Sequence, residues 1–348
     1  MLPGAVVAAK SCAFDTDLRG ARSAVGRQLS LLAGGANLEF ERQPSPQRPG
    51  TGMSSYPDTQ HHRPAHGDPE NPLLAEVVPT DVEEVEPRQI PLMPILLFLF
   101  TCYSTYTVED GGLAYAVAIM GILLCHEFGH YLQARRYGVP ASLPYFIPMP
   151  ISPIGTMGAV IAMRGHMGDR KALFDIGITG PLAGLVPALI CTVVGLRMSS
   201  IVEVVPDGDY LGAPLLFLWL SDLLLDPLGP GQAIDLHPIA FAGWVGVFIT
   251  ALNLIPIGQL DGGHVLYALL RKKAHPVATV LLVGAMLGVV LTGNYGWLLM
   301  IALLWLMGPN HPPTANDDIP LGTGRTILGW LTLCFMFIGF TPTPFMSM

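Results

Sequence analysis

The sequence predicts an α-helical polytopic membrane protein of about six to seven spans, with a short membrane-associated β-hairpin or strand after the second span. Composition is the first observation behind this prediction. Of the 348 residues, 51% are hydrophobic and only 13% are charged, and the mean hydropathy is +0.49. Soluble domains contain about 25% charged residues. The second observation is a succession of long apolar runs that begins near residue 90.

Residues 1–88 precede these runs and differ from them in composition. They are rich in Pro, Gly, Ser, Gln and Arg and lack apolar periodicity, which predicts a disordered N-terminal tail. We expect a membrane-embedded core at residues 89–310, followed at 311–348 by a linker and a final apolar helix. The chain shows no basic face with interleaved aromatic residues, so nucleic acid is not an expected partner.

The predicted spans are apolar runs separated by turn-forming or charged residues. Several of them are shorter than the roughly 20 residues that cross a bilayer core. The two runs on either side of Gly293 predict a tight hairpin, and the last run is also compatible with a helix in the membrane interface. A further apolar segment at 215–225 predicts an interfacial or packing helix. The runs lie at residues 90–107, 111–135, 175–197, 236–255, 277–292, 295–308 and 325–341.

Lysine and arginine residues predict the orientation of the chain in the membrane. Basic loops follow the second and the fourth predicted span, whereas the segment 199–235 holds six acidic residues and no basic residue. Because cytoplasmic loops are enriched in these residues, the N-terminal tail and the basic loops are expected in the cytosol. The basic residues are Arg135, Arg136, Arg164, Arg170, Lys171, Arg271, Lys272 and Lys273.

The segment 140–165 differs from the apolar runs around it. Its five prolines exclude a continuous helix, and residues 155–161 predict a short strand or hairpin. Non-helical backbone at membrane depth persists only where protein buries it or where it lines a wet cavity. Two interpretations follow: an ordinary cytosolic loop, or a strand edge that pairs with an unwound substrate segment.

Two histidines four residues apart lie inside the second apolar run. On a helix, His126 and His130 share a face and can bind one metal ion together. Glu127 lies one position round the helix, where its carboxylate can accept a proton from a metal-activated water without being a ligand. Ionisable groups at membrane depth are costly and tend to mark functional sites. The pattern predicts a metal centre, with a chance occurrence of the pattern as the alternative.

A catalytic zinc site needs a third protein ligand and an open position for water. Asp261 is the first candidate, because it stands at a Gly-rich break after the fourth span, on the same predicted side of the membrane as His126. Pro256 and Gly258 interrupt the helix before it, so the segment can turn back toward the metal. Asn253 is a buried amide two turns earlier.

Other interpretations of these residues remain open. Asp261 is also placed to cap the helix that follows it, and His264 is then the reserve ligand. Asp175 is a weaker third candidate. It is better explained as an ion-pair partner of Arg170 or Lys171, or as the cap of the third span.

Three stretches together resemble the site-2 proteases, zinc metalloproteases that cut within the membrane. The first is the His-Glu-x-x-His pattern at 126–130. The second is the Asn-x-x-Pro…Leu-Asp-Gly-Gly pattern at 253–263, and the third is the Asp-Arg-Lys…Gly-Pro-Leu-Ala-Gly run at 169–184. The resemblance covers about residues 95–310. It departs from the family at Leu254, where a proline is expected, and this leaves the local turn open.

The resemblance implies one zinc ion per chain, bound by His126, His130 and Asp261. It also implies that Glu127 is the general base and that Asn253 helps to hold the substrate or the oxyanion. The implied reaction is hydrolysis of a peptide bond within or near a transmembrane helix of a membrane-anchored protein, in regulated intramembrane proteolysis. The expected partners are therefore a transmembrane protein substrate and the lipid bilayer.

The stretch 144–148 is most similar to the branch of this family found in some bacteria and in plastids, and the chain leaves no room for the PDZ domain of other members. We expect an integral multi-pass protein of the bacterial inner membrane with its site toward the cytosol; a plastid membrane is the alternative. A prenyl-protein endopeptidase is disfavoured, because no glutamate follows Glu203 to serve as third ligand. A non-catalytic membrane zinc-binding or transport protein is the alternative from another class.

Overall fold

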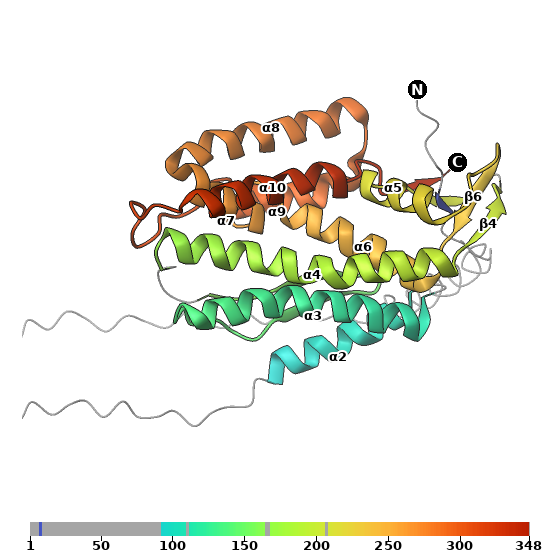
Figure 1. The fold of residues 1–348 in the computed structure, drawn as a ribbon, viewed down its shortest axis with the longest axis horizontal. Helices are drawn as coiled ribbons and strands as arrows, with labels where there is room; N and C mark the ends of the chain where they lie inside the picture. Colours follow the sequence, from blue (N-terminus) through green and yellow to red (C-terminus); the bar gives the residue numbers. More distant parts are fainter. Residues whose placement is uncertain (1–6, 9–91, 109–110, 164–167, 206–207, 348) are drawn as a thin grey trace, which may run out of the picture. The chain divides into compact units, whose positions relative to one another are not determined.

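The computed structural model describes residues 7–8, 92–108, 111–163, 168–205 and 208–347 (Figure 1). Most of the tail expected at 1–88 lies outside these residues. The exception is strand β1, Val7–Ala8, where the expectation of no regular structure is not met.

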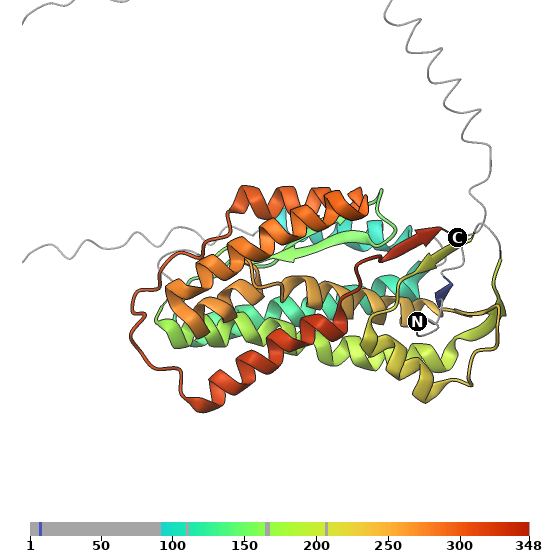
Figure 2. The same cartoon turned by 90° about the horizontal axis from the view of Figure 1, so that it is seen from above.

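Helices make up most of the described chain (Figures 1 and 2). Three helical segments, Gly112–Arg136, Arg170–Met198 and Asp261–Thr292, are long and apolar enough to cross a membrane, and the other apolar helices have 10–17 residues. The described residues therefore establish three candidate spans, fewer than the six to seven expected. The helices are α2 Leu92–Tyr106, α3 Gly112–Arg136, α4 Arg170–Met198, α5 Leu215–Leu224, α6 Pro238–Asn253, α7 Asp261–Leu270, α8 Ala274–Thr292, α9 Leu298–Met307 and α10 Thr323–Gly339.

Helices α3, α4 and α6 pack against one another and form the centre of the fold (Figure 1). Small residues allow the close approach. A Cβ on Gly195 of α4 would lie 2.1 Å from the backbone nitrogen of Ala240 in α6. A Cβ on Gly243 of α6 would lie 2.5 Å from the backbone nitrogen of Thr192 in α4. Without strong hydrophobic driving force in lipid, such close backbone packing is a main source of helix association.

Strands β2 Tyr145–Met149 and β3 Gly155–Val160 form an antiparallel hairpin, which confirms the strand predicted at 155–161. The pairing shifts register before Pro148, which has no N–H to donate. The hairpin turn is fixed to neighbouring helices: Ser104 donates to the Gly155 carbonyl at 2.6 Å, and Tyr115 donates to the Ile154 carbonyl at 2.7 Å.

A second sheet, which the sequence did not predict, lies at the end of α4 opposite its basic start. Its strand order is β4-β6-β1-β5-β7. It includes three strands of the acidic segment 199–235 together with the chain end, so both chain termini contribute to one sheet (Figure 2). The new strands are β4 Ser200–Glu203, β5 Asp209–Leu211, β6 Gln232–Asp235 and β7 Phe345–Ser347.

Asp175 forms an ion pair with Arg325, so the predicted pairing with Arg170 or Lys171 was wrong. The Asp175 carboxylate accepts two hydrogen bonds from Arg325 of α10, each at 2.8 Å, and another from Tyr137. It does not pair with Arg170 or Lys171, and α4 is instead capped by Asp169, whose Oδ1 accepts the N–H groups of Lys171 and Ala172. The ion pair ties the last helix to the centre of the fold.

Candidate metal centre

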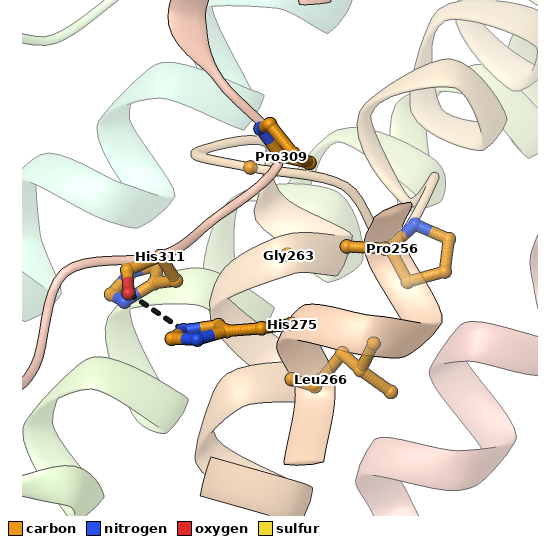
Figure 3. Close-up of a pocket in the computed structure, with 9 residues that line it drawn as sticks. Pro256, Gly263, Leu266, His275, Pro309 and His311 are labelled. Atoms are coloured by element: carbon orange, nitrogen blue, oxygen red, sulfur yellow. Dashed lines mark hydrogen bonds between the residues drawn. The ribbon is translucent and has the colours of Figure 1, made fainter. Parts of the chain in front are cut away.

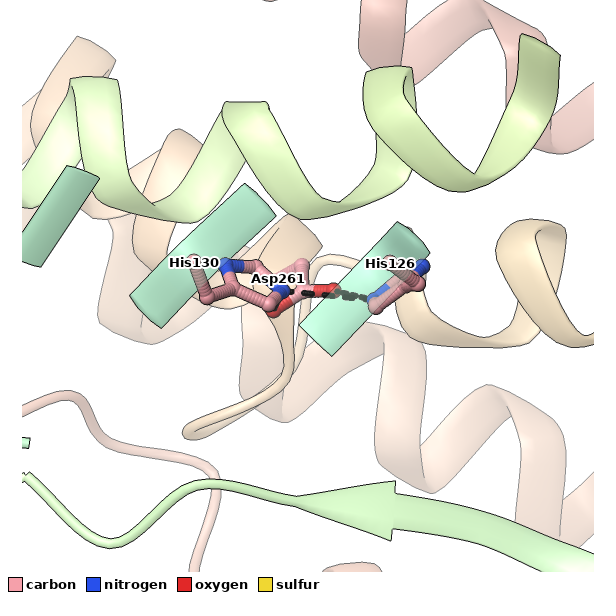
Figure 4. A group of neighbouring side chains, drawn as sticks. All are labelled: His126, His130 and Asp261. Atoms are coloured by element: carbon pink, nitrogen blue, oxygen red, sulfur yellow. Dashed lines mark hydrogen bonds and ion pairs between the residues drawn. The ribbon is translucent and has the colours of Figure 1, made fainter. Parts of the chain in front are cut away.

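Three side chains from two distant segments meet at one point (Figure 4). His126 and His130 lie one turn apart on α3, and Asp261 is the first residue of α7. The Nε2 atoms of the histidines are 3.2 Å apart, and the two Asp261 oxygens lie 3.1 Å from His126 Nε2 and 3.2 Å from His130 Nε2. Among the described residues, this is the group of His, Cys, Asp or Glu that could hold a metal ion.

A reversal of the chain after α6 brings Asp261 to the histidines. Helix α6 ends at Asn253, and Gly258 adopts a φ of +59° that favours glycine. A Cβ on Gly258 would also lie 2.6 Å from the Gly308 carbonyl oxygen. The N-cap of α7 is Leu260, so Asp261 is not the cap of this helix, and its carboxylate oxygens lie 3.1–3.2 Å from the two histidine Nε2 atoms instead.

The backbone of α4 orients His130. Its Nδ1 lies 2.7 Å from the Ile176 carbonyl oxygen, and because a carbonyl only accepts, Nδ1 carries the proton. When the ring is neutral, its Nε2 atom keeps a lone pair, and this atom faces Asp261 and His126. A backbone carbonyl that fixes the tautomer in this way is the usual partner of a metal-binding histidine.

Glycines of α4 leave the room that the two histidines occupy. A Cβ on Gly180 would lie 2.0 Å from His130 Nε2, and a Cβ on Gly184 would lie 2.9 Å from the Cβ of His126. Any other residue at Gly180 would therefore displace the His130 ring. The Gly-x-x-Gly-x-x-x-Gly spacing at 177–184 places these glycines on one helix face.

The geometry and the donor set fit a zinc ion. Ligands about 2.1 Å from a tetrahedral zinc ion lie about 3.4 Å from one another. The two histidine Nε2 atoms are 3.2 Å apart, and each lies 3.1–3.2 Å from a different oxygen of the Asp261 carboxylate, so one ion can reach all three side chains. Three protein ligands leave the fourth position of such a site for water. Two imidazoles and a carboxylate are common zinc ligands.

The other two expected site residues lie beside this group. Glu127 is buried, with 4% of its surface exposed, and its carboxylate interacts electrostatically with all three side chains of the group. Asn253 reaches the group from the end of α6, where its Nδ2 lies 3.4 Å from His126 Nε2. The structure thus brings all five expected site residues together.

The reserve candidates lie elsewhere. His264 pairs with His311 through a 2.7 Å contact, and Asp175 pairs with Arg325. The sequence did not predict two further residues. His311 lies in a loop, where no periodicity marks it, and Ile176 contributes a backbone carbonyl, which leaves no trace in the residue pattern. The glycine spacing in α4 is a signal that could have located the wall behind the metal centre.

A His-His-Asp group with buried histidines and a half-buried aspartate lies beside a glutamate, on helices long and apolar enough to cross a membrane. This arrangement defines a helical membrane protein with a candidate metal centre. Comparison with known proteins narrows this class. The chain belongs to Peptidase family M50, whose sequence model matches residues 114–292 and so includes the whole group.

Curated relatives agree with this assignment. "Probable zinc metalloprotease EGY1, chloroplastic" of Arabidopsis thaliana is 32% identical over 286 residues, which cover 78% of this chain and 48% of the relative. EGY1 of Oryza sativa subsp. japonica is 34% identical over 62% of this chain and 38% of the relative. "Probable zinc metalloprotease EGY2, chloroplastic" of Arabidopsis thaliana is 29% identical over 71% and 45%. The chain spans about half the length, or less, of these relatives.

Proposed function

We propose that this chain is a zinc-dependent intramembrane endopeptidase that hydrolyses a peptide bond within or near a transmembrane helix of a membrane-anchored protein. The single observation that carries the proposal is the meeting of His126, His130 and Asp261, whose two Nε2 atoms lie 3.2 Å apart and 3.1–3.2 Å from the two carboxylate oxygens. Its helices are candidate spans, and the chain belongs to a peptidase family. The names of its relatives support zinc as the metal. The group of His126, His130 and Asp261 supports one ion per chain.

In the proposed mechanism, His126, His130 and Asp261 hold the zinc ion. Bound zinc supplies a Lewis acid that polarises the scissile carbonyl and lowers the pKa of a water to about 7. Glu127 accepts the proton of the attacking water as general base and returns it to the leaving amine. Burial of the Glu127 side chain excludes competing bulk water from this proton transfer.

Two further parts of the chain act on the substrate in this proposal. The Asn253 amide lies at the edge of the metal centre and donates a hydrogen bond to the oxyanion. Among the described residues, β2 and β3 form a two-stranded sheet, so each strand has one edge without a strand partner. In this proposal such an edge pairs with an unwound substrate segment and presents one peptide bond in extended form. Unwinding is required because the backbone of an intact helix is already hydrogen-bonded.

The wider setting is also part of the proposal. We place six to seven spans in the membrane, with the metal centre toward the side of the basic loops. Of the two membranes considered, the bacterial inner membrane and a plastid membrane, the chloroplastic names of the relatives favour the plastid one. The cut releases a membrane-held regulator in regulated intramembrane proteolysis.

A Glu127→Gln variant tests the role of the base. The amide is isosteric and cannot accept the proton, so we expect cleavage to fall by about 10²-fold or more. Zinc content should stay at the wild-type level, because Glu127 is not one of the three ligands. The measurement co-expresses the full chain with a panel of tagged single-span membrane proteins that carry helix-breaking residues, and follows their shortened products on gels.

Full cleavage by this variant would contradict the assignment of the base. Zinc binding by the wild type without cleavage of any panel member, at matched expression, would favour the non-catalytic zinc-binding alternative.

A further inference from the structure

The helix that carries Asp261 is short and receives little support from its own ends. Helix α7 has ten residues, Asp261–Leu270, with no side-chain cap at its start. Its last turn runs into Arg271, whose φ of 55° is unfavourable for a residue with a Cβ. Neighbouring segments must therefore fix its position and rotation.

The segment between α9 and α10, residues 308–322, provides this support. It contacts α7 at successive turns. His264 Nδ1 lies 2.7 Å from His311 Nε2, and Tyr267 donates to Asp317 Oδ2 at 2.7 Å. The side chain of residue 264 lies one turn after that of Asp261, so the first of these contacts acts on the turn that begins with the candidate metal ligand.

His311 is the centre of this contact, and Figure 3 shows it beside His275 at a small pocket. It is buried, and it lines a small pocket together with Pro256, Gly263 and Leu266. The ring of Tyr267 stacks on it at 4.7 Å between centroids, and His275 donates to its backbone carbonyl at 3.0 Å. The stacking on Tyr267 and the hydrogen bond with His264 restrict the orientation of the His311 ring.

The hydrogen bonds of His311 also fix its tautomer. Its Nδ1 bonds to the Pro312 carbonyl, which only accepts, so Nδ1 carries the proton. Burial lowers the pKa of His311, although its bond to the Pro312 carbonyl acts in the opposite direction, so the ring is neutral at pH 7. The Nε2 atom is then an acceptor, and His264 donates to it from Nδ1.

We propose that His311 is a positioning residue for the metal centre: its hydrogen bond with His264 fixes the first turn of α7 and so holds Asp261 against His126 and His130. The inference rests on the proposed function, since it concerns the affinity of the same three ligands for zinc. Outer partners of this kind commonly change metal affinity by about 10–100-fold.

Two amide variants at His311 separate its two hydrogen bonds. His311→Asn places its amide where Nδ1 lies and keeps the bond to Pro312, but it cannot reach His264. His311→Gln places its amide where Nε2 lies and keeps an acceptor for His264. The probe is zinc alone, titrated into metal-free full-length chain in detergent against a chromogenic chelator, with thermal unfolding of the metal-free protein measured in parallel.

We expect His311→Asn to weaken zinc binding by about 10-fold or more and His311→Gln to keep the wild-type affinity. Asp318→Asn is the control from the same segment, since this side chain is 94% exposed, and it should also keep that affinity. Wild-type affinity in His311→Asn would overturn the inference. So would equal weakening in both variants, or failure of both to fold, because His311 would then act on the fold alone.

The same titration keeps this inference separate from the proposed function. If Asp261→Ala binds zinc as the wild type does, the proposed metal centre is wrong. If Asp261→Ala loses zinc but His311→Asn does not, the positioning role alone is wrong.

Discussion

Gly180 determines how closely α4 approaches the candidate metal centre. A Cβ at this position would overlap the Nε2 atom of His130, which the Ile176 carbonyl holds in place from the other side of the ring. His130 thus has no free space to move into on α4. The orientation of one ligand follows from two backbone features of a neighbouring helix, and neither of these is a side chain.

We therefore expect Gly180→Ala to weaken zinc binding by about 10-fold or more, because the new methyl group moves the His130 ring away from Asp261. The measurement is the zinc dissociation constant by chelator competition. Gly284→Ala is the matched control on α8, since a Cβ there meets no atom within 4 Å. Equal affinities in the two variants would show that α4 does not set the position of His130.

At the scale of elements, the segment 308–322 joins α7 to α10. Asp317 accepts hydrogen bonds from Thr314 and Tyr267 on its two oxygens, and Arg325 at the start of α10 pairs with Asp175. Helix α10 and the segment before it therefore pack as part of the same unit as the metal centre. Interactions of this kind are not visible as periodicity in the sequence.

The Asp317 contact makes stability depend on pH. Partial burial raises the pKa of Asp317, but the hydrogen bonds from Thr314 and Tyr267 outweigh it and lower the pKa below its usual value. A lowered folded-state pKa contributes stability above the unfolded pKa of about 3.9, and this contribution is lost as pH falls through the folded value.

Asp317→Asn keeps an acceptor but loses the charge. We expect it to lower Tm at pH 6 and to have a smaller effect near pH 3, where wild-type Asp317 is itself becoming protonated. Thermal unfolding of the two proteins across this range is the measurement, and Asp318→Asn controls for the change in loop charge. A Tm difference that is constant from pH 6 to pH 3 would contradict this account of Asp317.

At the scale of the whole molecule, the sequence predicted the helices better than their contacts. Apolar runs located α2, α3, α4 and α6, and the prolines near 144–153 correctly excluded a helix where the β2–β3 hairpin lies. The predicted grouping of His126, His130 and Asp261 is present in the structure, while their role as ligands stays a prediction.

The sequence did not predict pairs that join distant segments. Arg325 lies 150 residues from Asp175, and His311 lies 47 residues from His264. The second sheet was missed for the same reason, because strands of two to four residues are too short for a two-residue alternation to be recognised. Such contacts depend on how the helices pack, and one chain's periodicity does not contain that information.

The central claim is that two segments 131 to 135 residues apart build one zinc site, and zinc content tests it most directly. (The separations are those of His130 and His126 from Asp261.) The measurement is zinc per chain in purified full-length protein, for the wild type and for Asp261→Ala, by elemental mass spectrometry. We predict about one zinc per wild-type chain and a marked loss in the variant, because two histidines alone hold zinc weakly. Equal zinc in both proteins, or none in the wild type after loading, would contradict the account.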